Sequence, residues 1–128
     1  MSKQQLLILD DLGIDKQQFQ SIANEKDIDY DLIWQLGEEN TNSIMGIICV
    51  KTQIDQQLIR RYKNLKFIAV AFTGYNNVDL QSCRQNNIAV FNVPDYSTDS
   101  VAELTLGLGL SLLREIPKTQ QKLRSGKW

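Results

Sequence analysis

Apolar residues in the first ninety positions fall into short runs, and polar or mixed segments of about helical length separate them. Runs of four to seven residues with β-branched and aromatic members are typical of strands. The continuous run at Phe67–Phe72 predicts a strand covered on both faces, as in a parallel sheet, and the run at Ile44–Val50, apolar except for Gly46, predicts a central strand. The run pattern predicts five strands, near residues 5–9, 28–33, 44–50, 67–71 and 88–91.

Helices are predicted between these strands, each opened by an aspartate. Asp15, Asp55 and Asp79 stand where an N-cap belongs, because an aspartate side chain accepts the first free backbone N–H groups of a helix. The three predicted helices run to about Asn24, Tyr62 and Asn86. The first should pack inward through Phe19, Ile22 and Ala23. Asn86–Asn87 should end the third, since asparagine tolerates the left-handed conformation.

Strands that alternate with helices predict the α/β class, with a doubly wound parallel sheet of about five strands. Each crossover brings the next polar loop to the carboxyl edge of the sheet, where ligands bind in open α/β folds. The loops that should meet there begin at Lys51, Thr73 and Asn92.

The last thirty residues have a different pattern. Ser100 and Glu103 fit a capping box, and leucines at positions 104, 106, 108, 110, 112 and 113 follow. A long helix that is apolar all round predicts burial on all sides. Gly107 and Gly109 would let another backbone approach closely. Pro117 fits the first turn of a second short helix, which carries Lys118 to Arg124.

Composition limits the partners. The chain has 128 residues, a net charge of −1 and scattered lysines and arginines, so we expect no nucleic-acid partner. There is no histidine and no CxxC, and we therefore expect no metal site. The N-terminus does not resemble a signal peptide, and no apolar stretch is long enough to span a membrane. Cys49 and Cys83 are expected to be buried thiols of a reduced, cytoplasmic protein.

Three segments resemble a known family. They are LKFIAVAFTGYNNVDL (65–80), NNIAVFNVPDYSTDSVAELTLGLGLSLLR (86–114) and SGKW (125–128). They are similar to the amino-terminal part of the D-isomer-specific 2-hydroxyacid dehydrogenases, which include glycerate, phosphoglycerate, D-lactate and formate dehydrogenases. The resemblance is weak over residues 1–50 and strong from residue 64 onward. It implies a flavodoxin-like substrate-binding domain over residues 1–98, and linking helices over 99–128 that lead toward a Rossmann domain.

The resemblance also implies a chemistry. The enzyme would use NAD or NADP to interconvert small 2-hydroxy and 2-keto acids, and it would be a homodimer with a contact through residues 101–113. The family's GxGxxG fingerprint and its catalytic Arg, Glu and His follow the GKW-like position, and this sequence contains no GxGxxG and no histidine. We therefore expect no catalytic residue in this chain, no cofactor bound to it, and no activity of the chain alone.

Thr73 and Gly74 are the first candidate site residues. Consecutive backbone N–H groups at the end of a strand can bind an anion, and glycine would leave room for it. The resemblance implies that this loop receives the substrate carboxylate and lies near the cofactor at Thr73. Lys51 and Thr52 would line the same cleft. Without the resemblance, Gly74 is equally well a turn glycine and Lys51 a solvated lysine.

Tyr96 and Ser97 follow the last strand, and the resemblance implies that their loop reaches substrate or nicotinamide. Val101 would pack near the nicotinamide ring, although helix core is the simpler interpretation. Asp79 and Glu103 are most simply helix caps.

Two other functions remain open at this point. A phosphoacceptor receiver module would use Asp10–Asp11, but Val50–Lys51 and Asn92 stand where it needs an aspartate and a lysine. A non-catalytic oligomerisation module would keep the fold and use the leucine-rich helix as its contact.

Overall fold

The computed structural model describes residues 4–34, 36–37 and 39–127. The chain divides into two compact units, one ending at Pro94 and the other beginning at Asp95. Trp128, the last residue of the SGKW segment, lies outside the described residues.

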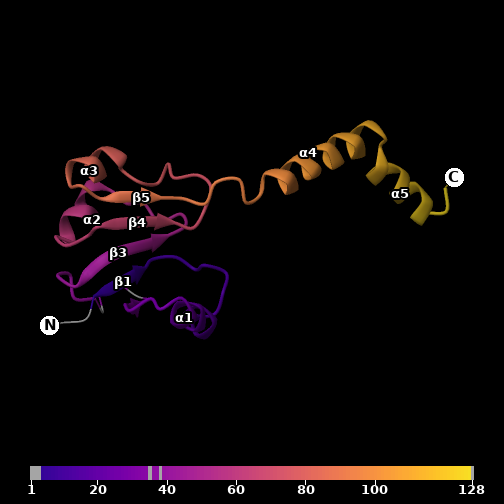
Figure 1. The fold of residues 1–128 in the computed structure, drawn as a ribbon. Coiled ribbons are helices and arrows are strands. Elements are labelled where there is room, and N and C mark those ends of the chain that lie inside the picture. Colours follow the sequence, from indigo (N-terminus) through magenta and orange to yellow (C-terminus); the bar gives the residue numbers. More distant parts are fainter. Residues whose placement is uncertain (1–3, 35, 38, 128) are drawn as a thin grey trace. The chain divides into compact units, whose positions relative to one another are not determined.

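The first unit is built on one parallel sheet. Its strands are β1 (Gln5–Ile8), β2 (Asp31–Ile33), β3 (Ile44–Cys49), β4 (Phe67–Val70) and β5 (Ala89–Phe91). Their spatial order is β2-β1-β3-β4-β5, and all four pairings are parallel. Figure 1 labels β1, β3, β4 and β5 in this order. This is the flavodoxin-like order, so the predicted fold class is confirmed.

Three helices connect the strands: α1 (Lys16–Glu25), α2 (Gln56–Arg61) and α3 (Leu80–Gln85). The predicted caps are confirmed. Asp15 accepts from the N–H groups of Gln17 and Gln18, Asp55 from that of Leu58, and Asp79 from that of Ser82. α3 ends as predicted, with Asn86 as its C-cap and the left-handed Asn87 (φ 55°) after it. The sequence therefore specifies these helix boundaries locally.

The core lies between the sheet and the pair α2 and α3. Leu7, Ile47 and Ile68 from three neighbouring strands are fully buried, and they share one cluster with Tyr62 beside α2 and Cys83 of α3. Right-handed crossovers place α2 and α3 on this face and α1 on the other, since β1 connects to β2 in the opposite direction across the sheet.

The face of the sheet that carries α1 is less covered than predicted, since strands covered on both faces were expected. Along β4, buried residues alternate with partly buried ones, and Phe91 of β5 is 59% exposed. The α1 face has no helix over β4 and β5 within this unit, which explains the exposure. Phe67 covers part of this face by lying over Gly46, where a Cβ would come within 2.3 Å of the ring. A larger residue at that position of β3 would have to displace this ring.

Two predicted details near α1 are wrong. β2 begins at Asp31 instead of residue 28, because Asp27 is left-handed (φ 53°) and the N–H of Ile28 donates back to Ala23 O (2.9 Å). These residues form the turn that ends α1, and the strand can begin only after it. Of the predicted inner face, Ala23 is buried, but Ile22 is 45% exposed. Phe19 packs edge to face on Trp34, with ring centroids 5.5 Å apart.

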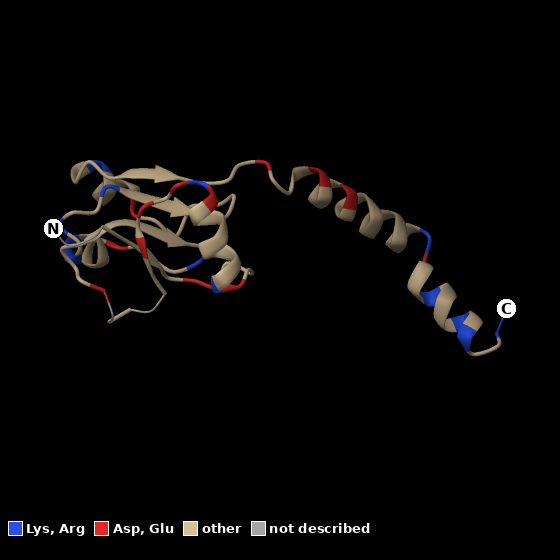
Figure 2. Ribbon diagram, turned by 60° about the horizontal axis from the view of Figure 1, so that its bottom comes forward, with Lys and Arg blue, Asp and Glu red and all other residues tan. Residues whose placement is uncertain are grey.

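The second unit contains α4 (Thr98–Leu113) and α5 (Ile116–Arg124). The predicted capping box is wrong. The N-cap is Ser97, whose carbonyl accepts the N–H of Val101 (2.9 Å), and Ser100 lies inside the helix. Pro117 does stand in the first turn of α5, as predicted. Figure 2 shows acidic positions near the start of α4 and basic positions along α5.

The predicted burial of the leucine-rich helix is also wrong for this chain. No described residue of α4 is buried, and its leucines are 57–80% exposed. A unit of two helices cannot enclose a helix that is apolar all round. A Cβ at Gly107 or Gly109 would meet nothing within 4 Å, so these glycines receive no close backbone here. None of the described helices has the length and hydropathy needed to cross a membrane.

Candidate functional site

Hydrogen bonds join the loops that leave the carboxyl ends of β3 and β4. The N–H of Ile54 donates to Asn77 O (2.8 Å), and the N–H of Asp79 donates to Ile54 O (2.9 Å). The side chain of Asn77 adds a third contact, from Nδ2 to Thr52 O (2.8 Å). Backbone groups beyond the strands thus find partners in the adjacent loop, and both loops are held in place.

The loop after β5 supports the loop after β4 in the same way. Asn92 Nδ2 donates to Thr73 O (2.8 Å), and the N–H of Val93 donates to Phe72 O (3.1 Å). The carbonyl of Thr73 is therefore fixed from one side. As predicted, the segments that begin at Lys51, Thr73 and Asn92 lie at one edge of the sheet.

Asp10, at the end of β1, anchors the loop after β3. Its Oδ2 accepts the N–H groups of Val50 (2.6 Å), Lys51 (3.0 Å) and Thr52 (3.0 Å), and its Oδ1 accepts Thr52 Oγ1 (2.7 Å). Partial burial raises the pKa of Asp10, but the bonds from Thr52, Val50 and Lys51 outweigh it and hold the pKa below its ordinary value.

Sequence reasoning missed this role of Asp10. The available signal was a carboxylate directly after β1, next to the loop of the neighbouring strand β3. With its acceptors committed to residues 50–52, Asp10 is not an open phosphoacceptor. The structure therefore argues against the receiver-type function.

The amides of Thr73 and Gly74 contrast with those of residues 50–52. Both residues are exposed, and within the part of the chain that the structure describes their N–H groups donate no hydrogen bond. A Cβ at Gly74 would meet nothing within 4 Å, and its φ is not in the left-handed region. The packing and backbone of this unit do not require glycine here, and the two N–H groups are open to a ligand.

A hollow of about 260 Å³ lies on the same side of the sheet. Tyr75 and Asn92 line it with polar groups, and Leu80 and Val90 with apolar ones. Tyr75 and Asn92 belong to the loops after β4 and β5 and were not predicted as site residues. The hollow adjoins the unpaired amides through Tyr75, which follows Gly74, and Asn92, which bonds Thr73 O, and a small hollow of mixed lining suits a small polar ligand.

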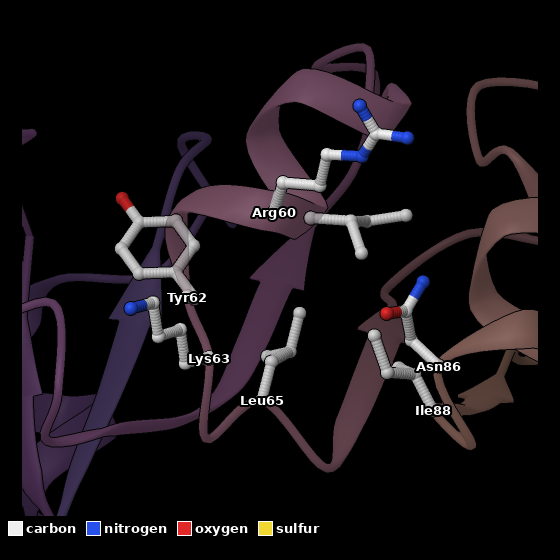
Figure 3. Close-up of a pocket in the computed structure, with 7 residues that line it drawn as sticks. Arg60, Tyr62, Lys63, Leu65, Asn86 and Ile88 are labelled. Atoms are coloured by element: carbon white, nitrogen blue, oxygen red, sulfur yellow. The ribbon is translucent and has the colours of Figure 1, made fainter.

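A second hollow, of about 240 Å³, lies at the opposite edge, where the chain enters β4 and β5 (Figure 3). Its polar groups do not converge on a ligand position. The hydroxyl of Tyr62 points away from Leu65 and Ile88 and donates to Glu39 Oε1 (2.9 Å). The amide nitrogen of Asn86 donates to Ser82 O (2.8 Å). We therefore place the candidate site at the carboxyl edge.

The other predicted site residues fall into two groups. Lys51 lies in the first unit with an exposed side chain, and the hydroxyl of Thr52 is engaged by Asp10. Tyr96, Ser97 and Val101 belong to the second unit, where Tyr96 and Val101 are each 57% exposed. The structure thus brings Lys51, Thr52, Thr73 and Gly74 to one edge of one unit.

The two thiols show no sign of reactivity. Cys49 and Cys83 are buried and unpaired. Burial raises the pKa of Cys49 to about 11, and the Asp10 carboxylate adds to the effect. Burial also raises the pKa of Cys83. Both stay protonated near neutral pH, which makes them poor nucleophiles and poor metal ligands. Across the described residues, no three Cys, Asp or Glu side chains are grouped to hold a metal ion.

Two known proteins are similar in sequence to a large part of this chain. Hydroxypyruvate reductase of Thermotoga maritima is 42% identical over 77 residues, which are 60% of this chain and 25% of that protein. Glyoxylate/hydroxypyruvate reductase A of Arabidopsis thaliana is 37% identical over 92 residues, 71% of this chain and 29% of that protein. The chain thus spans less than a third of these relatives.

Two solved structures have a fold similar to that of this chain. A 2-hydroxyacid dehydrogenase from Ketogulonicigenium vulgare Y25 superposes with a TM-score of 0.79 at 28% identity, over all of this chain and 41% of that one. D-Lactate dehydrogenase from Aquifex aeolicus, solved with NAD and lactic acid, has a TM-score of 0.75 over 96% of this chain and 38% of its own. At 19% identity, that second likeness shows the fold alone.

The family match is broader than the two sequence alignments. Residues 6–123 match the sequence profile of the D-isomer specific 2-hydroxyacid dehydrogenase catalytic domain. This range contains the open amides of Thr73 and Gly74 and the loops around them. The chain therefore belongs to the D-isomer-specific 2-hydroxyacid dehydrogenase family.

Proposed function

We propose that this chain is the substrate-binding part of an NAD(P)-dependent oxidoreductase that interconverts small D-2-hydroxy acids and 2-keto acids such as hydroxypyruvate or glyoxylate. The observation that carries the proposal is the pair of unpartnered N–H groups at Thr73 and Gly74, beside a small hollow at the carboxyl edge. A substrate carboxylate accepts these two bonds. Two neutral N–H donors alone bind it weakly, because strong recognition of a carboxylate needs a cationic, bidentate partner such as an arginine.

The chain's own residues position the substrate, and the cofactor supplies the hydride when it is bound. Residues 1–98 would form the substrate-binding domain, and residues 99–128 would lead toward the nucleotide-binding domain. No GxGxxG occurs in these 128 residues, and Val101 is more than half exposed. We therefore expect no saturable binding of NAD by this chain alone.

Titration with glyoxylate tests the proposed site. The backbone amides of Thr73 and Gly74 should move first in nitrogen–proton correlation spectra. Gly74→Val should abolish these shifts, because its side chain occupies the space beside the two N–H groups. Asn76→Val is the matched control, since it places the same side chain on an exposed residue of the same loop and leaves Gly74 unchanged. Glyoxylate shifts around Asp10 and Asp11 in the unmodified chain would overturn the assignment.

The chemistry of the complete enzyme should be missing from this chain. Hydride transfer needs a proton donor poised near neutral pH and a pocket for the nicotinamide. The sequence has no histidine and no nucleotide fingerprint. The purified chain should not oxidise NADH in the presence of hydroxypyruvate. Turnover that persists after removal of contaminating enzymes would contradict this assignment of roles.

A second candidate function, self-association, is favoured by the exposed leucines of α4. Leu106, Leu112 and Leu113 are 69%, 77% and 80% exposed, which is unusual on a soluble monomer. Covering about 400 Å² of this surface at about 25 cal/mol per Å² would contribute roughly 10 kcal/mol before association costs. We propose that the protein is a homodimer with residues 101–113 in the contact.

Sedimentation tests this contact. Replacing Leu106 and Leu110 together with glutamate should convert the chain to a monomer. Gln120→Glu with Gln121→Glu adds the same charge on α5 and should leave association unchanged. An unmodified chain that sediments as a monomer would refute the proposed contact. The buried, unpaired cysteines support our further proposal that the protein acts in the reducing cytoplasm.

A further inference from the structure

The direction of the chain crossovers reverses between the neighbouring strands β1 and β3. From β1 the chain crosses to β2 on one side, and from β3 it continues to β4 and β5 on the other. This is the topological switch point, where sheets of this order characteristically hold their ligands. In this chain the N–H groups of residues 50–52, which follow β3, donate there to Asp10, which follows β1.

The donors that meet Asp10 form a complete site for one carboxylate. Three consecutive N–H groups, those of Val50, Lys51 and Thr52, converge on Asp10 Oδ2 at 2.6–3.0 Å. The hydroxyl of Thr52 donates to Oδ1 at 2.7 Å. Both oxygens are thus satisfied, and successive backbone N–H groups of this kind bind anions elsewhere. The only unusual feature is that the anion belongs to the chain itself.

We infer that residues 50–52 form an anion-binding site for a small carboxylate, which Asp10 keeps filled. Removal of the Asp10 side chain opens the site to a free carboxylate of similar size. The site itself does not depend on the proposed dehydrogenase function. One consequence does rest on that function: with the switch point filled, a substrate carboxylate is directed to the open amides of Thr73 and Gly74.

Chemical rescue by formate tests the inference. Asp10→Gly removes both the Cβ and the carboxyl group, and sodium formate is then titrated while the amides of Val50, Lys51 and Thr52 are followed. We expect these three signals to move saturably toward their positions in the unmodified chain. The concentrations needed should be on the order of 10–100 mM, because the free ion must pay an association cost that the tethered side chain avoids.

Matched controls separate this site from general effects of charge or salt. Asp11→Gly removes a carboxylate one residue away, whose Oδ1 accepts only the N–H of Gly13 among the contacts the structure describes (2.8 Å), and formate should leave residues 50–52 unmoved in it. Asp10→Asn keeps a side chain of nearly the same size in the site, so formate should not move the amides of residues 50–52 in this variant either. Sodium chloride at equal ionic strength and neutral formamide should have no effect on Asp10→Gly.

The outcomes are decisive even if Asp10→Gly unfolds. Formate that binds only the folded chain must then raise the ratio of folded to unfolded chain by mass action, about ten- to hundredfold at 1 M for a dissociation constant of about 10–100 mM. The inference is overturned if formate neither moves residues 50–52 nor refolds the variant, or if Asp11→Gly responds equally. Glyoxylate titration of the unmodified chain is scored separately at residues 73–74. A failure there would count against the proposed function and leave the formate result standing.

Discussion

Two loops leave neighbouring strands at the same edge of the sheet and use their backbone N–H groups differently. After β3, the amides of residues 50–52 all point at the carboxylate of Asp10. After β4, the amides of Thr73 and Gly74 donate to nothing within the described chain. One loop therefore contributes its donors to the stability of the fold, and the other leaves its donors free for the ligand that we propose.

Among the variants that test this contrast, Asp10→Ala should lower the free energy of unfolding most. A single hydrogen bond to a charged group contributes about 1.5–3 kcal/mol. In the variant, the N–H groups that Asp10 no longer binds can donate to water, which offsets part of the loss. We therefore expect the free energy of unfolding to fall by about 3 kcal/mol. Urea unfolding measures it. Asp11→Ala, the matched control, should cost less than about 1 kcal/mol. Equal losses would mean that Asp10 has no special role.

Asn77→Ala should have the next largest effect. Its Nδ2 donates to Thr52 O, so the variant removes this side-chain contact between the loops after β3 and β4 and leaves their backbone bonds in place. We expect a loss of about 1–2 kcal/mol, because the carbonyl left behind is only partly buried. Asn76→Ala is the matched control on the exposed neighbouring residue and should fall within about 0.5 kcal/mol of the unmodified chain. A larger loss for Asn76 than for Asn77 would contradict the role of this contact.

Lowering the pH should reduce the stability that Asp10 gives to the fold through the loop after β3. The pKa of Asp10 is lower in the folded chain than in the unfolded one, so folding favours the ionised carboxylate. Its stabilisation is complete above the ordinary aspartate pKa of about 3.9 and is lost as pH falls through the lower folded-state pKa.

Asp10→Asn should therefore lose less stability than the unmodified chain between neutral pH and about pH 3. Part of the acid sensitivity should remain, because the pKa values of Glu39 and Asp79 are also lowered. Identical acid profiles for the two chains would exclude Asp10 as the group responsible.

The smallest effect should be that of Gly74→Ala on stability. A Cβ there meets no atom within 4 Å, so the free energy of unfolding should change by less than about 0.5 kcal/mol. Gly46→Ala is the contrasting variant, since its Cβ would press on the ring of Phe67 and should cost about 1–3 kcal/mol. Thermal unfolding compares the two. A strongly destabilised Gly74→Ala would show that the glycine serves the fold instead of a ligand.

Much of the fold could be predicted from the sequence because its signals are local. Asp15, Asp55 and Asp79 cap helices by contacts within three residues, and the apolar runs locate four of the five strands closely. β2 was predicted too long because the left-handed Asp27 and the bond from Ile28 to Ala23 prolong the end of α1. Alternation of apolar residues cannot reveal such a turn.

The site could be predicted only in part. The apolar run that stops at Thr73–Gly74 points to open amides at a strand end. The partner of Asp10 lies forty residues away, and only the strand order β2-β1-β3 brings the two together. The exposure of α4 was missed for a related reason: an all-round apolar helix indicates that it is to be covered, and the sequence pattern does not show whether this chain contains the cover.

Amide hydrogen exchange of the unmodified chain tests the contrast between the two loops most directly. The N–H groups of Val50, Lys51 and Thr52 should exchange slowly, because opening them requires release of Asp10. Those of Thr73 and Gly74 should exchange at nearly the rate of an unfolded chain, and glyoxylate should slow only these two. Equal protection of both loops without ligand, or protection of residues 50–52 by glyoxylate, would contradict the account.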